Sequence, residues 1–355
     1  MNHALACWII TPQTLPLAQK IEQMLAQNPW KWASHSFANC AFFATKSLAK
    51  ATSFSNLGQT FAEQYRTFAA HLFLGACGIA VRIVAPLLLH KSIDPPICVL
   101  DPQGQFVIPI LSGHWGGGNS LARHIASLLN ATPVITTATD VLNKPALDLL
   151  LKKADLKILD WQNLAQMQTT LLEEDHLAVY DPHHVLKSRW LIPLPSPEHH
   201  SPYIHIDWRA EQKASHKLRV AIPCLCLGIG CKKNCDSTLI QMLFHTFCAQ
   251  FGFCEEAFCC LATIDAKSQE SAILTLAAYH ALTLKFFPAT KLASITTPNP
   301  SPLAGTIFGQ PPFSVAEACA LLAANDIFEQ PTLLLPKVRM ANCVTFAVAT
   351  AKRYC

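Results

Sequence analysis

Charged side chains are scarce in this sequence. Asp, Glu, Lys and Arg make up 14% of its 355 residues, while 51% are hydrophobic; an ordinary globular protein has about 25% charged residues. This balance excludes an intrinsically disordered chain, which needs few apolar residues and many charges. The net charge is only +4, and no Lys/Arg cluster is dense enough to follow a nucleic-acid backbone. We therefore expect a folded protein that does not bind nucleic acid.

Long hydrophobic runs are also absent. The longest ones, at 72–81 and 220–230, fall well short of the about 20 apolar residues of a membrane helix. The N-terminus has neither the basic leader nor the small-residue cleavage site of a signal peptide. We therefore expect a cytoplasmic protein without a membrane segment. At about 150 residues per domain, the length predicts two or three domains.

Cysteine is abundant, with 15 in the chain, but without an export signal a disulfide scaffold is not expected. Cys224, Cys226, Cys231 and Cys235 come closest to a set of metal ligands. Their spacing matches neither a zinc nor an iron–sulfur pattern. We therefore expect buried structural thiols and no bound metal.

Strands and helices alternate in the first part of the chain. The predicted strands are 4–10, 71–76, 97–100, 105–111 and 133–135, and the predicted helices are 12–27, 77–89 and 119–130. The Asp101-Pro-Gln-Gly104 sequence between two of these strands is typical of a type I hairpin turn. Such alternation predicts an α/β domain, at 1–141, with a mostly parallel sheet.

A second alternating region begins at 217. Its predicted strands are 218–227, 258–262, 282–287, 332–335 and 343–349, and its predicted helices are 236–250, 269–280 and 314–324. The middle segment, 142–216, has a predicted helix at 144–159, and its Pro- and His-rich end at 181–216 is interpreted as a surface loop and linker. The predicted fold is therefore two α/β domains with mostly parallel sheets, 1–141 and 217–355, joined by this smaller segment.

The strongest local signal for a site is the loop SGHWGGGNS at 112–120. It follows a strand and opens an amphipathic helix, where backbone N–H groups favour an anion, and its glycines allow close approach to the main chain. We expect Asn119 or Ser120 to cap the helix. The loop is neither a Walker A nor a GxGxxG sequence, so a phosphate is not favoured over a carboxylate; a purely structural turn is the alternative. The residues expected to bind the anion are Ser112, Gly116, Gly117, Gly118 and Asn119.

Three other residues of this domain are candidates for chemistry. His114 can act as a general acid or base near neutral pH, or only contact a ligand. Asp140 follows the predicted strand at 133–135, in the position where α/β sites gather, and its alternative role is a helix N-cap. Arg82 interrupts an apolar stretch, so we expect it to pair with an acid such as Asp94 or to meet an anionic substrate.

The second domain repeats the pattern of a glycine-rich turn before a helix. Its GIGCKK sequence, at 228–233, adds two lysines beside the helix N-terminus, which favours anions. A stable structural turn is again the alternative. The residues expected to bind substrate here are Gly228, Gly230, Lys232, Lys233, Asp265 and Lys267.

Several of these motifs together resemble the CbiG family of cobalamin biosynthesis. They are GACGIAVRIVAPLL at 75–88, the run from Asp94 to Arg123 and PVITTATD at 133–140. LGIGCKK at 227–233, LATIDAK at 261–267 and LLLPK at 333–337 resemble the family's C-terminal domain, which also occurs in the CobE proteins of the aerobic pathway. The chain departs from the family at Trp115, usually aliphatic, and at Asn234-Cys235, usually of Gly-Thr type.

This resemblance implies an enzyme, a cobalt-precorrin-5A hydrolase of the anaerobic pathway that cleaves a carbon–carbon bond. Water opens the δ-lactone of the macrocycle, and the C20 unit leaves as acetaldehyde. The implied substrate is an anionic tetrapyrrole that carries its own cobalt, so no protein cofactor is implied; neighbouring methyltransferases are candidate partners. The roles of His114 and Asp140 are assigned from chemistry and position. A non-catalytic carrier of corrinoid intermediates is the alternative function.

Overall fold

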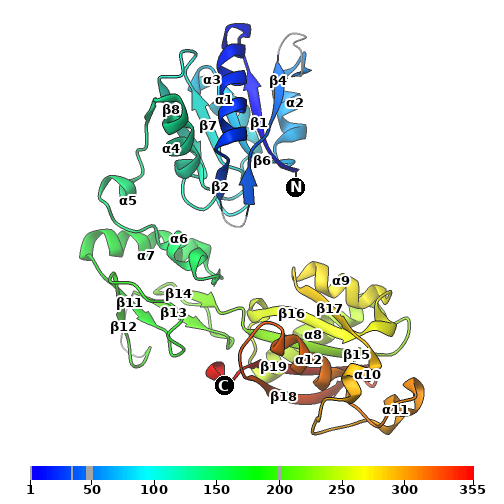
Figure 1. Cartoon of the computed structure of the whole chain (residues 1–355). Helices are drawn as coiled ribbons and strands as arrows, with labels where there is room; N and C mark the ends of the chain where they lie inside the picture. The colour runs from blue at the N-terminus through cyan, green and yellow to red at the C-terminus, as the bar shows by residue number, and fades with distance from the viewer. Residues whose placement is uncertain (1, 33–34, 45–50, 198–201) are drawn as a thin grey trace. The chain divides into compact units, whose positions relative to one another are not determined.

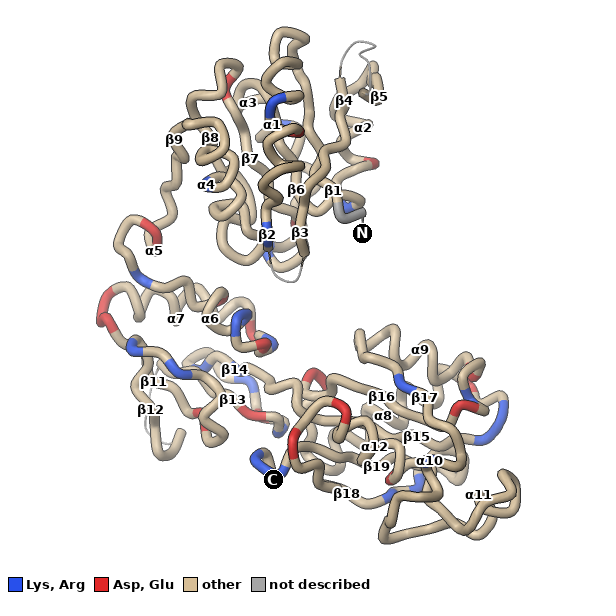
Figure 2. Tube along the Cα trace, in the orientation of Figure 1, with Lys and Arg blue, Asp and Glu red and all other residues tan. Residues whose placement is uncertain are grey.

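The computed structural model describes residues 2–32, 35–44, 51–197 and 202–355 (Figure 1). The chain divides into two compact units, Met1–Leu149 and Leu150–Cys355, and each is described by itself. Charged residues are sparse along the trace of both, as the composition predicts (Figure 2). In the described part of the chain, no helix is long and apolar enough to cross a membrane.

The first unit is built on a seven-stranded sheet with the order β5-β4-β1-β6-β7-β8-β9. Its strands are β1 (Asn2–Ile9), β4 (Cys40–Ala44), β5 (Ala51–Ser53), β6 (Phe68–Leu74), β7 (Ile97–Leu100), β8 (Phe106–Leu111) and β9 (Thr132–Pro133). All neighbours are parallel except β7 and β8. These two form the predicted hairpin, closed by a 2.9 Å hydrogen bond from Gly104 N–H to the Asp101 carbonyl.

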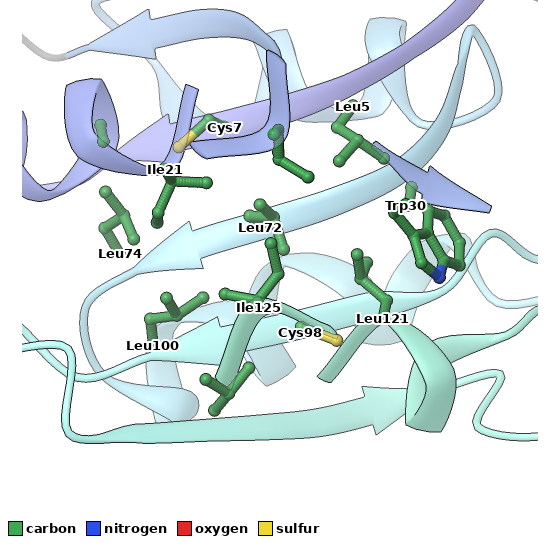
Figure 3. Close-up of a cluster of buried hydrophobic side chains, with 14 of the residues drawn as sticks. Leu5, Cys7, Ile21, Trp30, Leu72, Leu74, Cys98, Leu100, Leu121 and Ile125 are labelled. Carbon is green, nitrogen blue, oxygen red and sulfur yellow. The ribbon is translucent and has the colours of Figure 1, made fainter. Parts of the chain in front are cut away.

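Helices cover both faces of this sheet because side chains alternate along the strands. Leu5 and Cys7 of β1 pack with α1 (Leu15–Gln27) and α4 (Gly118–Leu129) on one face (Figure 3). Ala6 and Trp8 face the other side, where α2 (Leu57–Gln64) and α3 (Cys77–Val84) pack. The unit is completed by the small sheet of β2 (Trp30–Trp32) and β3 (His35–Phe37), the short helix α5 (Ala138–Val141), and the 3₁₀ turns at Pro12–Thr14 and Ala85–Leu87.

The first part of the second unit is a five-stranded sheet of the order β10-β14-β13-β11-β12. Its strands are β10 (Lys157–Ile158), β11 (Leu177–Tyr180), β12 (Leu191–Pro193), β13 (Tyr203–Asp207) and β14 (Lys217–Ala221), with helix α7 (Trp161–Glu174). The helix predicted at 144–159 is shorter, α6 (Leu147–Lys153).

The interpretation of 181–216 as a surface linker is wrong for β13. All five residues of this strand are buried, and it pairs with β11 and β14 at the centre of the sheet. The sequence hides it because a five-residue strand of alternating polarity lies among prolines and histidines. The predicted single strand at 218–227 is also divided, since Pro223 separates β14 from the next strand, and β14 belongs to this middle sheet.

The C-terminal sheet has the order β17-β16-β15-β19-β18. Its strands are β15 (Leu225–Cys231), β16 (Phe258–Ile264), β17 (Thr283–Phe287), β18 (Pro331–Met340) and β19 (Val344–Ala351). The helices are α8 (Ser237–Phe251), α9 (Ser271–Tyr279), α10 (Ala289–Ala293), α11 (Pro302–Phe308) and α12 (Val315–Asn325), with 3₁₀ turns at Glu255–Ala257, Asp265–Lys267 and Lys352–Tyr354. The first three strands are parallel, and β19 is antiparallel to both of its neighbours. The predicted α/β fold with mostly parallel sheets is therefore confirmed.

Candidate functional site

The candidate site of the first unit lies where β8 and β9 end. Because these two strands run parallel, the loops that follow them, at 112–117 and 134–137, leave the same edge of the sheet. Strand β8 is antiparallel to β7, with Leu111 beside Ile97, so this edge is the amino-terminal edge of β7. His114 and Asp140 follow these two strand ends, as predicted, and therefore lie at the same edge of the sheet. In most α/β proteins the site lies at the opposite edge, at the carboxyl ends of the parallel strands.

The backbone of the 112–120 loop is closed by its own hydrogen bonds. The N–H groups of Gly117, Gly118 and Asn119 donate to the carbonyls of His114, Ser112 and Gly113, at 2.9 to 3.0 Å. Gly117 is the N-cap of α4, with φ at +89°, so the prediction of Asn119 or Ser120 as the cap is wrong. These three N–H groups already have acceptors, so the predicted anion-binding role of the main chain does not fit Gly117 and Gly118.

The glycines of this loop instead permit close packing. A Cβ added at Gly117 would lie 2.5 Å from the indole ring of Trp32, and one at Gly116 would lie 2.7 Å from Cβ of Ser112. The Ser112 hydroxyl donates to the Asp94 carbonyl at 2.7 Å, which fixes the start of the loop. The loop is therefore a rigid frame that holds His114 and Asn119 in place.

His114 faces the residues of α5. Its Nε2 lies 2.8 Å from the Thr139 hydroxyl and 3.6 Å from Oδ2 of Asp140. The nearby carboxylate favours the tautomer that carries its proton on Nε2, because that proton can then point at Thr139 and Asp140. In this tautomer Nδ1 keeps its lone pair and is the basic nitrogen of the ring.

Asp140 is held by donors at both of its oxygens. Arg123 donates to Oδ1 at 2.6 Å, and the side-chain amide of Asn119 donates to Oδ2 at 2.8 Å. The same amide also donates to the Thr137 hydroxyl at 3.0 Å. The Asp140 side chain is only 17% exposed. With both oxygens hydrogen-bonded, the Asp140 carboxylate is held in a fixed position beside His114.

Arg123, Thr137 and Thr139 were not predicted as site residues. Arg123 follows Asn119 by four residues, so both lie on one face of α4, and that spacing is a signal that the sequence offers. The contact of Thr139 with His114 joins segments 25 residues apart and has no local signal.

Arg82 does not form the predicted pair with Asp94. It is exposed on α3, and Asp94 is paired with Arg66 at 3.8 Å. The Asp94 carboxylate also accepts a hydrogen bond from Leu89 N–H at 3.0 Å. The other expectation for Arg82, contact with an anionic substrate, stays a prediction.

In the second unit, the predicted turn at 228–230 is part of a strand. Gly228 and Gly230 lie inside β15, and a Cβ at Gly228 would meet the Ala316 carbonyl oxygen at 1.8 Å. Helix α12 approaches the strand so closely that only glycine fits there. The predicted glycine-rich loop is therefore wrong at these two positions, and Gly228 serves strand–helix packing. The expected contact of these glycines with substrate stays a prediction.

The loop after β15 already holds a carboxylate of the protein itself. The buried Glu270 accepts from the N–H groups of Asn234 and Cys235 at 3.2 and 3.0 Å, and from the Lys267 ammonium at 3.0 Å. Burial acts to raise the pKa of Glu270, but the Lys267 ammonium and these N–H groups outweigh it and hold the pKa below its ordinary value. Lys267 is therefore engaged within the protein, whereas Lys232, Lys233 and Asp265 are exposed.

The prediction that the four cysteines of 224–235 are buried is confirmed only in part. Cys224 and Cys226 are buried, but Cys231 and Cys235 are only partly buried. Burial raises the pKa of Cys231 to about 11. Within the described ranges, no three His, Cys, Asp or Glu side chains are grouped so that they could hold a metal ion.

These features define a class: an α/β protein with a His–Asp cluster at one sheet edge of its first unit. The family model described as "Cobalamin synthesis G N-terminal" matches residues 59–140, which span that cluster, and "Cobalamin synthesis G C-terminus" matches 225–349. The chain belongs to the CbiG family.

Several known proteins are similar to this chain. A cobalt-precorrin-5A hydrolase of Priestia megaterium is 28% identical over 304 residues, covering 80% of this chain and 79% of the relative. One of Salmonella typhimurium is 44% identical over 110 residues, covering 31% of each chain. A solved structure of a putative cobalamin biosynthesis protein G homolog from Sulfolobus solfataricus covers 99% of this chain and 98% of its own, at 20% identity and a TM-score of 0.37. The structure of CobE covers 36% of this chain and 94% of its own, at 26% identity and a TM-score of 0.34.

Proposed function

We propose that this chain is a cobalt-precorrin-5A hydrolase, an enzyme that cleaves a carbon–carbon bond in cobalamin biosynthesis. The observation that carries the proposal is the match to the CbiG family over 59–140 and 225–349. The relatives named as such hydrolases include one aligned over 80% of this chain. The His114–Asp140 cluster inside the first matched region supports a hydrolytic reaction, because it supplies a candidate base.

The reaction has two bond-breaking steps. Water adds to the lactone carbonyl, and the bond between that carbonyl carbon and the ring oxygen breaks, which leaves a carboxylate and a hydroxyl on C20. When this hydroxyl loses its proton, the bond between C20 and the macrocycle breaks. Acetaldehyde leaves, and the macrocycle keeps the electron pair and takes up a proton. Both steps need a group that accepts a proton from oxygen.

We assign that group to His114. Its neighbours favour the tautomer with a basic Nδ1, and the fixed charge of Asp140 stabilises the imidazolium that forms on proton uptake. Arg123 and Asn119 are positioning residues that act through Asp140. The cobalt is part of the substrate, so we propose no cofactor, and we expect the enzyme to act in the cytoplasm beside the methyltransferases of its pathway.

The test is acetaldehyde release from cobalt-precorrin-5A by the purified chain and by single variants. Loss of a general base costs about 10²- to 10⁴-fold in rate, so His114→Ala should lower saturating turnover by at least about 10²-fold while substrate still binds. His124→Ala is the matched control, because that side chain lies on α4 and contacts the Asn28 carbonyl instead; its turnover should stay unchanged.

The outcomes separate the alternatives. If His114→Ala keeps its turnover, His114 is only a contact, and Asp140→Asn becomes the deciding variant. If neither variant loses turnover, the base lies outside this cluster. A wild-type chain that binds the substrate tightly and releases no acetaldehyde would be a carrier of the intermediate and would refute the hydrolase assignment.

A further inference from the structure

The most exposed apolar side chains of the first unit lie in two segments that contact the candidate site. Among its described residues, the four large hydrophobic side chains with the greatest exposure are Leu89 (66%), Val141 (64%), Ile93 (56%) and Leu142 (55%). We call these four residues the apolar rim. Monomeric proteins seldom expose large apolar side chains in groups without a binding role.

Both segments are hydrogen-bonded to the 112–120 loop. In the first segment, 89–94, the Ser92 carbonyl accepts a 3.1 Å hydrogen bond from the Trp115 indole N–H. The Asp94 carbonyl accepts a hydrogen bond from the Ser112 hydroxyl. The second, at 137–142, contacts His114 and Asn119 through Thr139 and Asp140. The two segments that carry the apolar rim therefore both lie beside the loop that holds His114.

The segments have ordered backbones rather than loose ones. Leu89 N–H donates to the Asp94 carboxylate at 3.0 Å, and Asp94 N–H donates to the His90 carbonyl at 2.9 Å. Val141 and Leu142 donate to the Thr137 and Ala138 carbonyls at 3.1 and 2.9 Å. Local hydrogen bonds thus present the apolar side chains to solvent before any ligand arrives, which lowers the entropic cost of binding.

The charges of these segments suit an anionic ligand. Their two acids lie within ion-pair distance of arginines, Asp94 of Arg66 at 3.8 Å and Asp140 of Arg123 at 2.6 Å. An apolar surface whose acids are paired in this way fits a large ring that is apolar on its face and carries carboxylates on its periphery.

We propose that Leu89, Ile93, Val141 and Leu142 form the surface on which the apolar face of the tetrapyrrole macrocycle rests, with His114 at its border. This inference rests on the proposed function and deepens it. It assigns binding of the ring to side chains of the first unit that the motifs do not mark.

The probe is uroporphyrin, a fluorescent tetrapyrrole with eight carboxylates, titrated into the full-length protein. The double variants Leu89→Gln/Ile93→Gln and Val141→Gln/Leu142→Gln should each raise its Kd by about tenfold or more, because two apolar contacts are lost. Leu89→Met/Ile93→Leu should keep the wild-type Kd. Phe106→Gln is the matched control; Phe106 is also exposed but lies at the opposite end of β8, roughly 17 Å away along the strand.

The results bear on the rim and on the hydrolase separately. An unchanged Kd for uroporphyrin in both double variants would refute the apolar rim as a ring-binding surface. If these variants also change the sedimentation coefficient, the rim is instead a contact between two copies of the chain. If all variants release acetaldehyde with an unchanged KM for cobalt-precorrin-5A, the rim is wrong and the hydrolase stands. If the wild type releases none but the Kd pattern holds, the hydrolase fails and the ring-binding surface stands.

Discussion

Replacing Gly228 by alanine should destabilise the second unit strongly. The added Cβ would lie 1.8 Å from the Ala316 carbonyl oxygen and 2.7 Å from the Ala320 backbone nitrogen. Both are backbone atoms of α12, so no side-chain rotation relieves the clash, and α12 must move away from β15 by more than 1 Å, roughly, to reach ordinary contact distance. Overpacking a tight core costs about 1–3 kcal/mol and sometimes more. We expect Gly228→Ala to lower the free energy of unfolding by about 3 kcal/mol.

Urea unfolding of the full chain measures this effect, and Gly78→Ala is the control. Gly78 lies in α3, and an added Cβ there meets nothing within 4 Å, so alanine should be neutral or stabilise by up to about 1 kcal/mol. The reasoning is refuted if Gly228→Ala unfolds like the wild type. A variant of wild-type stability with weakened ligand binding would restore the interpretation of Gly228 as an anion-binding residue.

Two further predictions concern titration and metal content. Burial lowers the pKa of His71 to about 4, against the opposing effect of its hydrogen bond to the Tyr65 carbonyl. The unfolded chain binds this proton near pH 6.5, so the free energy of unfolding is unaffected by His71 above about pH 6.5 and decreases by about 1.4 kcal/mol per pH unit from there toward pH 4. An NMR titration that gives His71 an ordinary pKa would contradict this. Because burial raises the pKa of Cys40 to about 12 and that of Cys254 to about 12, these thiols stay protonated and bind metal poorly. Protein purified under reducing conditions should contain no stoichiometric zinc or iron, and one retained equivalent by elemental analysis would show the expectation to be wrong.

Helical periodicity predicted α1, α4 and α8 well, because burial of one face is a local property of the sequence, but it did not predict α7. In α8, predicted at 236–250, the apolar residues Ile240, Phe244 and Phe247 are all buried. The hairpin between β7 and β8 was predicted for the same reason, since Asp101 and Gly104 close it locally. The central strand β13 was missed because its burial comes from β11 and β14 on either side. Its five residues alternate in polarity, and such a short pattern does not indicate that strands lie on both sides.

Only the features of the site that follow from the order of strands and loops could be predicted from the sequence. His114 and Asp140 were chosen because both follow strands, and the parallel pairing of β8 with β9 brings them within 3.6 Å. What Asp140 does there depends on Arg123 and Asn119, whose hydrogen bonds to it span 17 and 21 residues. Such distant partners leave no periodic trace in the sequence. Gly228 was misinterpreted for the same reason, since its partner Ala316 lies in a helix of a different part of the chain.

Two buried glutamates bear on how the second unit can meet an anionic substrate. Glu270 occupies the N–H groups of Asn234 and Cys235, and Glu317 accepts from the N–H groups of Asn299 and Lys337 at 3.1 and 2.9 Å. Burial acts to raise the pKa of Glu317, but the Lys337 N–H and the Asn299 side chain outweigh it and hold the pKa below its ordinary value. Both carboxylates are therefore ionised at neutral pH and already occupy these donors. A substrate carboxylate would then meet exposed side chains, such as those of the 232–233 pair, and their attraction weakens as salt is added.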